Sequence, residues 1–152
     1  MTKAKIRESV ISERVSWIRE MLTGIEKLPL ADMRSFAEDP RNTAAAESYL
    51  RRALEALMDL GRHILAKGFA VDVADYKGIP AKLGELGIIT PDTAATMKKL
   101  AGYRNRMVHF YNEISETELY EICRDELKDV NSVLNGILSW INSHPEMIDT
   151  TL

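Results

Sequence analysis

A short run of the chain gathers residue types that can act on a phosphate ester. Arg104, Asn105, His109 and Tyr111 all fall between residues 104 and 111. A guanidinium group binds phosphate oxygens through a forked pair of hydrogen bonds, and an imidazole with an unperturbed pKa of about 6.5 can move protons near neutral pH. The run therefore predicts a site for a phosphate-containing substrate.

The spacing within this run limits how its side chains can converge. Asn105 and His109 are four residues apart, so on a helix they share a face and the amide can orient the imidazole. Arg104 and His109 are five residues apart, which on a straight helix points them about 140° away from each other and separates them by about 7.5 Å along the axis. If the helix ends at His109 and the chain continues extended, His109 and Tyr111 point to the same side. One helix terminus would then carry a cation, an imidazole and a phenol.

The same residues also allow purely structural roles. Arg104 can tie helices together, His109 can be favoured by the dipole at a helix C-terminus, and Tyr111 can pack against its neighbours. Local chemistry alone leaves this alternative open.

Residues outside the run receive simpler interpretations. We expect His63 to be a surface residue, and Glu47 and Arg51, four residues apart, to form an exposed helical ion pair, with a role near the site as the alternative. Cys123 lies on an apolar stripe and is predicted to belong to the core rather than to act as a nucleophile. The sequence has no glycine-rich phosphate loop and no paired-histidine metal motif, so no metal or cofactor site is predicted.

Charge is segregated along the chain. The 152 residues carry 20 Lys+Arg and 23 Asp+Glu, and a net charge of −3 argues against a protein that coats nucleic acid through its overall field. From residue 98 to residue 109, however, four cations and no acid make the segment +4, whereas the stretch after it is rich in acids. Three of these cations are candidate substrate contacts: Lys98, Lys99 and Arg106.

Composition also bounds the class of protein. One cysteine excludes an intramolecular disulfide framework, and no stretch approaches the roughly 18 apolar residues that a membrane span needs. The N-terminal residues are charged rather than typical of a secretory segment, so we expect a cytoplasmic protein.

Helical periodicity runs through nearly the whole chain. We predict main helices over about 5–27, 39–68, 90–108 and 115–143, and a short helix near 80–87. Asp39-Pro40 and Thr90-Pro91 have the form of helix starts, and Ser115 with Glu118 forms a capping box. The sequence thus predicts an all-α, up-down bundle of four main helices plus a short one, in one domain of residues 1–152 with its core at about 5–143 and a short flexible tail at 144–152.

The run resembles a family signature. Arg104-Asn105-x-x-x-His109-x-Tyr111 is similar to the motif of HEPN-domain proteins of the HepT type, small all-α toxins encoded beside a minimal nucleotidyltransferase antitoxin, MntA. The resemblance extends over roughly residues 11–141. It includes the stretch Ala53-Leu54-Glu55-Ala56-Leu57-Met58-Asp59 and the stretch Leu86-Gly87-Ile88-Ile89-Thr90.

The resemblance implies a homodimeric, metal-independent endoribonuclease in which both subunits line one cleft. Arg104 would hold the scissile phosphate, His109 would act as general base or acid, and Asn105 would orient His109. Chemistry through the 2′-hydroxyl would make RNA, and not DNA, the substrate. Tyr111 matches the tyrosine to which the antitoxin transfers AMP, although Phe110 stands before it where an acid is common.

Two other classes stay open at this point. One is a non-catalytic HEPN module that binds a nucleotide or the nucleotidyltransferase through the same cleft. The other is a purely structural helical dimer.

Overall fold

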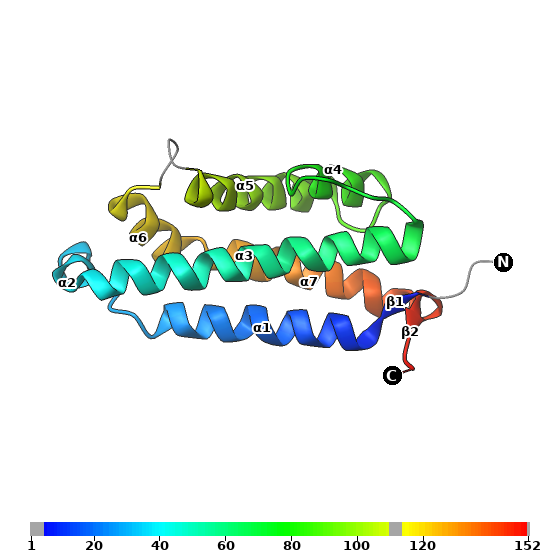
Figure 1. The fold of residues 1–152 in the computed structure, drawn as a ribbon, viewed down its shortest axis with the longest axis horizontal. Helices are drawn as coiled ribbons and strands as arrows, with labels where there is room; N and C mark the ends of the chain where they lie inside the picture. The colour runs from blue at the N-terminus through cyan, green and yellow to red at the C-terminus, as the bar shows by residue number, and fades with distance from the viewer. Residues whose placement is uncertain (1–4, 110–113, 152) are drawn as a thin grey trace.

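The computed structural model describes residues 5–109 and 114–151, and it confirms the predicted all-α class. The described residues form α1 (Glu8–Glu26), α2 (Met33–Glu38), α3 (Pro40–Phe69), α4 (Gly78–Glu85), α5 (Pro91–Val108), α6 (Glu116–Asp125) and α7 (Leu127–Ser143). Figure 1 shows α3 crossing the length of the molecule, with α1 along one side and α4 and α5 along the other. The central helix therefore contacts every other layer of the bundle.

Side chains at the helix starts explain where several helices begin. Asp39, Thr90 and Ser115 each accept a hydrogen bond from a backbone N–H two or three residues further on, at 2.9, 3.1 and 3.1 Å. Such a cap satisfies one of the backbone donors that the first turn of a helix leaves unpaired. The predicted starts of α3, α5 and α6 are thus confirmed.

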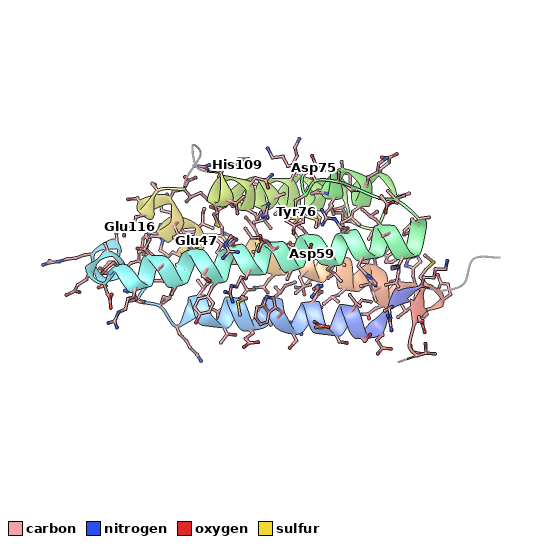
Figure 2. All side chains as sticks on the ribbon, viewed as in Figure 1. Glu47, Asp59, Asp75, Tyr76, His109 and Glu116 are labelled. Carbon is pink, nitrogen blue, oxygen red and sulfur yellow. The ribbon has the colours of Figure 1, made fainter. Side chains whose placement is uncertain are left out.

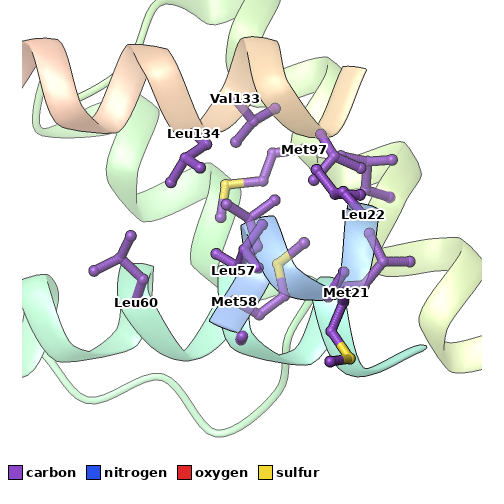
Figure 3. Close-up of a cluster of buried hydrophobic side chains, with 14 of the residues drawn as sticks. Met21, Leu22, Leu57, Met58, Leu60, Met97, Val133 and Leu134 are labelled. Atoms are coloured by element: carbon purple, nitrogen blue, oxygen red, sulfur yellow. The ribbon is translucent and has the colours of Figure 1, made fainter. Parts of the chain in front are cut away.

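The core surrounds α3 on more than one side. Figure 3 shows part of it, where side chains from four helices meet: Met21, Leu22, Leu57, Met58, Leu60, Met97, Val133 and Leu134. All eight are at most 5% exposed. Cys123 is also buried, as predicted, and burial raises the pKa of its thiol to about 12.

The structure differs from the predicted helix pattern in two places. The helix expected over 115–143 is broken at Glu126, whose φ of −116° and ψ of 6° separate α6 from α7. Apolar residues continue at four-residue spacing across the break, so periodicity could not reveal it. The short helix α2, capped by Asp32, is only six residues long and carries too little periodicity to be predicted.

The C-terminal residues differ from the flexible tail expected at 144–152. A 3₁₀ turn, η1 (Pro145–Met147), leads into β2 (Ile148–Asp149), which pairs in parallel with β1 (Ile6–Arg7). Ile6 is fully buried and lies against Gly68. The two ends of the described chain therefore pair with each other and pack against the C-terminal end of α3.

His63 is half-buried rather than a simple surface residue. Its Nε2 accepts a hydrogen bond from the backbone N–H of Arg7 at 3.0 Å, which ties α3 to β1. Burial lowers the pKa of His63, and the nearby cations of Lys67, Arg14 and Arg7 lower it further. Both causes favour the neutral imidazole that this hydrogen bond requires.

Across the described residues, we find no helix with both the length and the apolar character that crossing a bilayer demands.

Candidate active site

Helix α5 ends where the sequence predicts. Helix α5 ends at Val108, and His109 adopts an extended conformation with φ of −93° and ψ of 122°. The backbone N–H of His109 still donates to the carbonyl of Asn105 at 3.0 Å, and its side chain is exposed. Figure 2 shows His109 at this helix end. Tyr111, the predicted site of modification, lies outside the described residues.

Arg104 is held by partners on two sides. Its Nε and Nη2 donate to Oε2 of Glu55 at 3.0 and 2.9 Å, and its Nη1 donates to Oδ1 of Asn105 at 3.3 Å. The side chain of Arg104 is 24% exposed and that of Glu55 25%. The Asn105 amide, predicted to orient His109, thus contacts Arg104 in this structure.

Two acids and an arginine on α3 extend this contact. Arg51 lies one turn from each acid, and its Nε donates to Glu47 and its Nη1 to Oε1 of Glu55, both at 3.2 Å. Glu55 therefore joins two guanidinium groups, with one oxygen directed to Arg51 and the other to Arg104. The predicted ion pair between Glu47 and Arg51 is present, but it is partly buried beside the predicted site, with 29% of the Arg51 side chain exposed.

The loop between α3 and α4 adds an aromatic ring to the site. The guanidinium carbon of Arg104 lies 4.6 Å from the centroid of the Tyr76 ring, and that of Arg62 lies 4.9 Å from it. The Tyr76 hydroxyl donates to Oδ1 of Asp59 at 3.0 Å, and Figure 2 shows both residues between α5 and α3. Burial raises the pKa of Tyr76, and the adjacent carboxylate of Asp59 raises it further, so the phenol stays protonated.

Carboxylates neutralise much of the positive segment. The Lys99 ammonium lies 2.9 Å from Glu126 and 2.7 Å from Asp129, and hydrogen bonds to these two acids raise its pKa. Arg106 makes two hydrogen bonds to Glu118, at 2.8 and 2.6 Å, which lower the pKa of that carboxyl.

With Arg104 paired to Glu55, three of the four cations have an acidic partner. Lys98 is exposed and forms no ion pair with the residues that the structure describes. The segment's local field is therefore weaker than its sequence charge indicates.

Sequence reasoning missed Glu55 and Tyr76 as parts of the site. Glu55 carried a signal, because it is a charged residue inside the apolar stretch from Ala53 to Leu57 and lies one turn after Arg51. Tyr76 lies in a loop, and no sequence pattern marked it as part of the site. Among the described residues, no group of three or more histidine, cysteine or acidic side chains is arranged to hold a metal ion.

Comparisons with known proteins agree on one family. The family model described as ribonuclease HepT-like matches residues 11–137. A curated protein named tRNA nuclease HepT, from Aphanizomenon flos-aquae (strain 2012/KM1/D3), is 26% identical over 117 residues, which covers 76% of this chain and 78% of the relative.

Solved structures share the fold. A toxin–antitoxin structure with AMP-PNP aligns with a TM-score of 0.77 and 20% identity, covering 87% of this chain and 99% of the solved one. The tri-AMPylated Shewanella oneidensis HEPN toxin in complex with the MNT antitoxin also aligns with a TM-score of 0.77, at 22% identity, covering 86% and 97% of the two chains. At these identities the likeness establishes the helical architecture.

Proposed function

The chain belongs to the ribonuclease HepT-like family, and from this premise we propose that it is the toxin ribonuclease of a toxin–antitoxin pair whose antitoxin is a nucleotidyltransferase. The curated relative named as a tRNA nuclease supports RNA as the substrate. The observation that carries the proposal is a guanidinium, Arg104, held in place next to a helix end that presents an exposed imidazole, His109.

Arginine and histidine together can cleave RNA through its own 2′-hydroxyl. The 2′-oxygen attacks the adjacent phosphorus, the bond from phosphorus to the 5′-oxygen breaks, and a 2′,3′-cyclic phosphate forms. His109 takes the proton of the 2′-hydroxyl or supplies one to the leaving 5′-oxygen, and Arg104 stabilises the charge on the phosphate. DNA lacks the attacking hydroxyl, so it is not a substrate.

Two copies of the chain would complete the site. Arg104 and His109 lie five residues apart at the end of one helix, so their side chains diverge. In a dimer, Arg104 of one copy could face His109 of the other. Val108, next to His109, is an apolar side chain that is 47% exposed, which is consistent with an interface at this end of α5. A monomer with full activity would contradict this part of the proposal.

The partner would act on Tyr111. In that reaction the phenol oxygen attacks the α-phosphorus of ATP and releases pyrophosphate, leaving AMP on the tyrosine. The added phosphate would bring negative charge and bulk two residues after His109 in the sequence, which would repel RNA. Mass spectrometry after incubation with the antitoxin and ATP should show increments of AMP less water that vanish in Tyr111→Phe. Increments that persist in this variant would assign the modification to another residue.

Growth and cleavage assays test the ribonuclease directly. Expression of the wild type should arrest growth and cleave RNA in vitro, whereas His109→Ala should do neither. His144→Ala is the matched control, because His144 stacks on Trp140 beside the start of α5, at the opposite end of that helix. Equal growth arrest by wild type and His109→Ala, or intact cleavage by His109→Ala, would reject the catalytic proposal. Absence of cleavage by the wild type would favour the module that only binds.

A further inference from the structure

Glu55 contacts one particular edge of Arg104. A guanidinium has five N–H donors, and two parallel donors lie along its side edge, on Nε and Nη2. Both of these point to the same oxygen of Glu55, Oε2, at 3.0 and 2.9 Å. A carboxylate therefore already fills the side edge of Arg104.

The end edge of the same guanidinium is left for another anion. Glu55 uses one donor on Nε and one on Nη2, and Asn105 uses one on Nη1. One donor on each of Nη1 and Nη2 remains, and the one on Nη2 lies on the end edge, where a guanidinium can present a parallel fork. Such a fork matches two oxygens of a phosphate. The bound carboxylate thus decides which edge of Arg104 can meet a substrate.

Tyr76 restrains the same group from a different direction. Its ring covers one face of the Arg104 guanidinium at 4.6 Å, and Asp59 anchors the ring through the phenol hydroxyl at 3.0 Å. With Glu55 along one edge and Tyr76 across one face, rotation about the terminal bonds of Arg104 is opposed in two directions. Both restraints come from outside the signature run.

We propose that Glu55 and Tyr76 are positioning residues that hold Arg104 so that its end edge, and not its side edge, binds the scissile phosphate. This inference rests on the ribonuclease proposed above. It differs from an autoinhibitory contact, in which Glu55 would have to leave Arg104 before RNA could bind. It also differs from a purely structural ion pair, which would change stability and leave the kinetics of the folded protein unaltered.

The charge of Glu55 makes these alternatives distinguishable. Glu55 neutralises both Arg51 and Arg104, so Glu55→Gln leaves two guanidinium groups less compensated. RNA should then bind more tightly, because more positive charge faces its phosphates. Cleavage should nevertheless slow, because Arg104 is free to meet the phosphate through the wrong edge, and small misplacements cost about tenfold to a hundredfold in rate.

The experiment measures kcat and KM on one RNA for the full-length protein and its variants. We expect Glu55→Gln to lower kcat by about tenfold or more with an unchanged or lower KM. Glu55→Asp keeps the charge but shortens the side chain, so it should lower kcat without tightening RNA binding. Glu47→Gln is the control on the same helix, since Glu47 touches Arg51 and not Arg104, and it should keep kcat within about twofold of wild type.

Tyr76 supplies an independent arm of the experiment, which stays informative if the Glu55 variants fold poorly. Tyr76→Phe keeps the ring over Arg104 and should retain most of kcat, whereas Tyr76→Ala should lose about tenfold or more. A faster Glu55→Gln enzyme would establish the autoinhibitory contact, and unchanged kcat in folded Glu55→Gln or Tyr76→Ala would overturn the positioning role. If the wild type itself does not cleave RNA, the proposed function fails, and that result is separate from a failure confined to the variants.

Discussion

Gly61 lies where α3 packs closely against α4, and replacing it with alanine tests the packing. A Cβ at this position would lie 2.8 Å from Cγ2 of Ile79 and 3.0 Å from Cδ1 of Leu83. Carbon atoms pack at about 3.5–4.0 Å, so Ile79 has to move by roughly 0.7 Å or more. Because Gly61 is buried in the middle of a long helix, the surrounding core resists this movement.

Two opposing contributions set the expected change in stability. Alanine is favoured over glycine inside a helix by about 1 kcal/mol. Overpacking a filled core costs about 1–3 kcal/mol. We therefore expect Gly61→Ala to be destabilised by about 0–2 kcal/mol in spite of its better helix propensity.

Gly136 on α7 is the matched control. A Cβ there would meet Cγ2 of Thr93 at 3.4 Å, an ordinary contact, so Gly136→Ala should keep most of its propensity gain of about 1 kcal/mol. The free energies of unfolding of the two variants and the wild type are measured by urea denaturation at one protein concentration, since association with a second copy would shift them. In thermal unfolding, about 1 kcal/mol corresponds to roughly 2–4 °C for a chain of this size. If Gly61→Ala is as stable as Gly136→Ala, α4 does not pack tightly on α3 at Gly61.

Three further predictions concern other parts of the bundle. The pKa of His63 is lowered in the folded state, so the unfolded chain binds its proton more tightly and the free energy of unfolding should fall as the pH drops below about 6.5. Urea midpoints measured at about pH 7.5 and 5.5 should show this fall in the wild type. The fall should be smaller in His63→Gln, which keeps a hydrogen-bond acceptor for the backbone N–H of Arg7 but cannot titrate. Equal falls in the two proteins would contradict the role given to His63. Because the pKa of Cys123 is raised to about 12, a thiol reagent should label the unfolded protein and not the native one, and rapid labelling of the native protein would show that Cys123 is accessible. Thr90→Ala should lose about 1 kcal/mol of stability and Thr90→Ser should not, and equal stabilities would show that the cap contributes nothing.

The helix starts were predictable because each depends on residues within one turn. A capping side chain, a proline at the first helical position and an acid beyond it are all local, as at Thr90. The break at Glu126 was not predictable in this way. Its carboxylate accepts from the Tyr103 hydroxyl at 2.9 Å and pairs with Lys99 at 2.9 Å, both on a different helix. Contacts of that kind exist only once the bundle has formed.

The candidate site shows the same difference between local features, which could be predicted, and long-range contacts, which could not. The placement of Arg104, Asn105 and His109 at one helix end could be predicted, because helical periodicity and the helix boundary are local features of the sequence. Glu55 lies 49 residues before Arg104, and nothing local links the two side chains. Tyr76 reaches Arg104 only because the loop between α3 and α4 returns across α3. Sequence spacing thus located the chemical groups, whereas tertiary structure determines how one of them is held.

The charge distribution explains why restraint of Arg104 would matter for a ribonuclease. The four cations between residues 98 and 109 form the most basic stretch of the sequence, yet the fold pairs three of them with acids from α3, α6 and α7. A surface neutralised in this way attracts RNA weakly through its field, because few unpaired cations are available to displace counterions from phosphates. Under the proposed function, binding of the scissile phosphate would then depend on direct hydrogen bonds, which act only at the correct distance and angle. In the proposed site, an arginine held by Glu55 and Tyr76 would meet that requirement, and the same carboxylate that weakens the field would also fix the geometry.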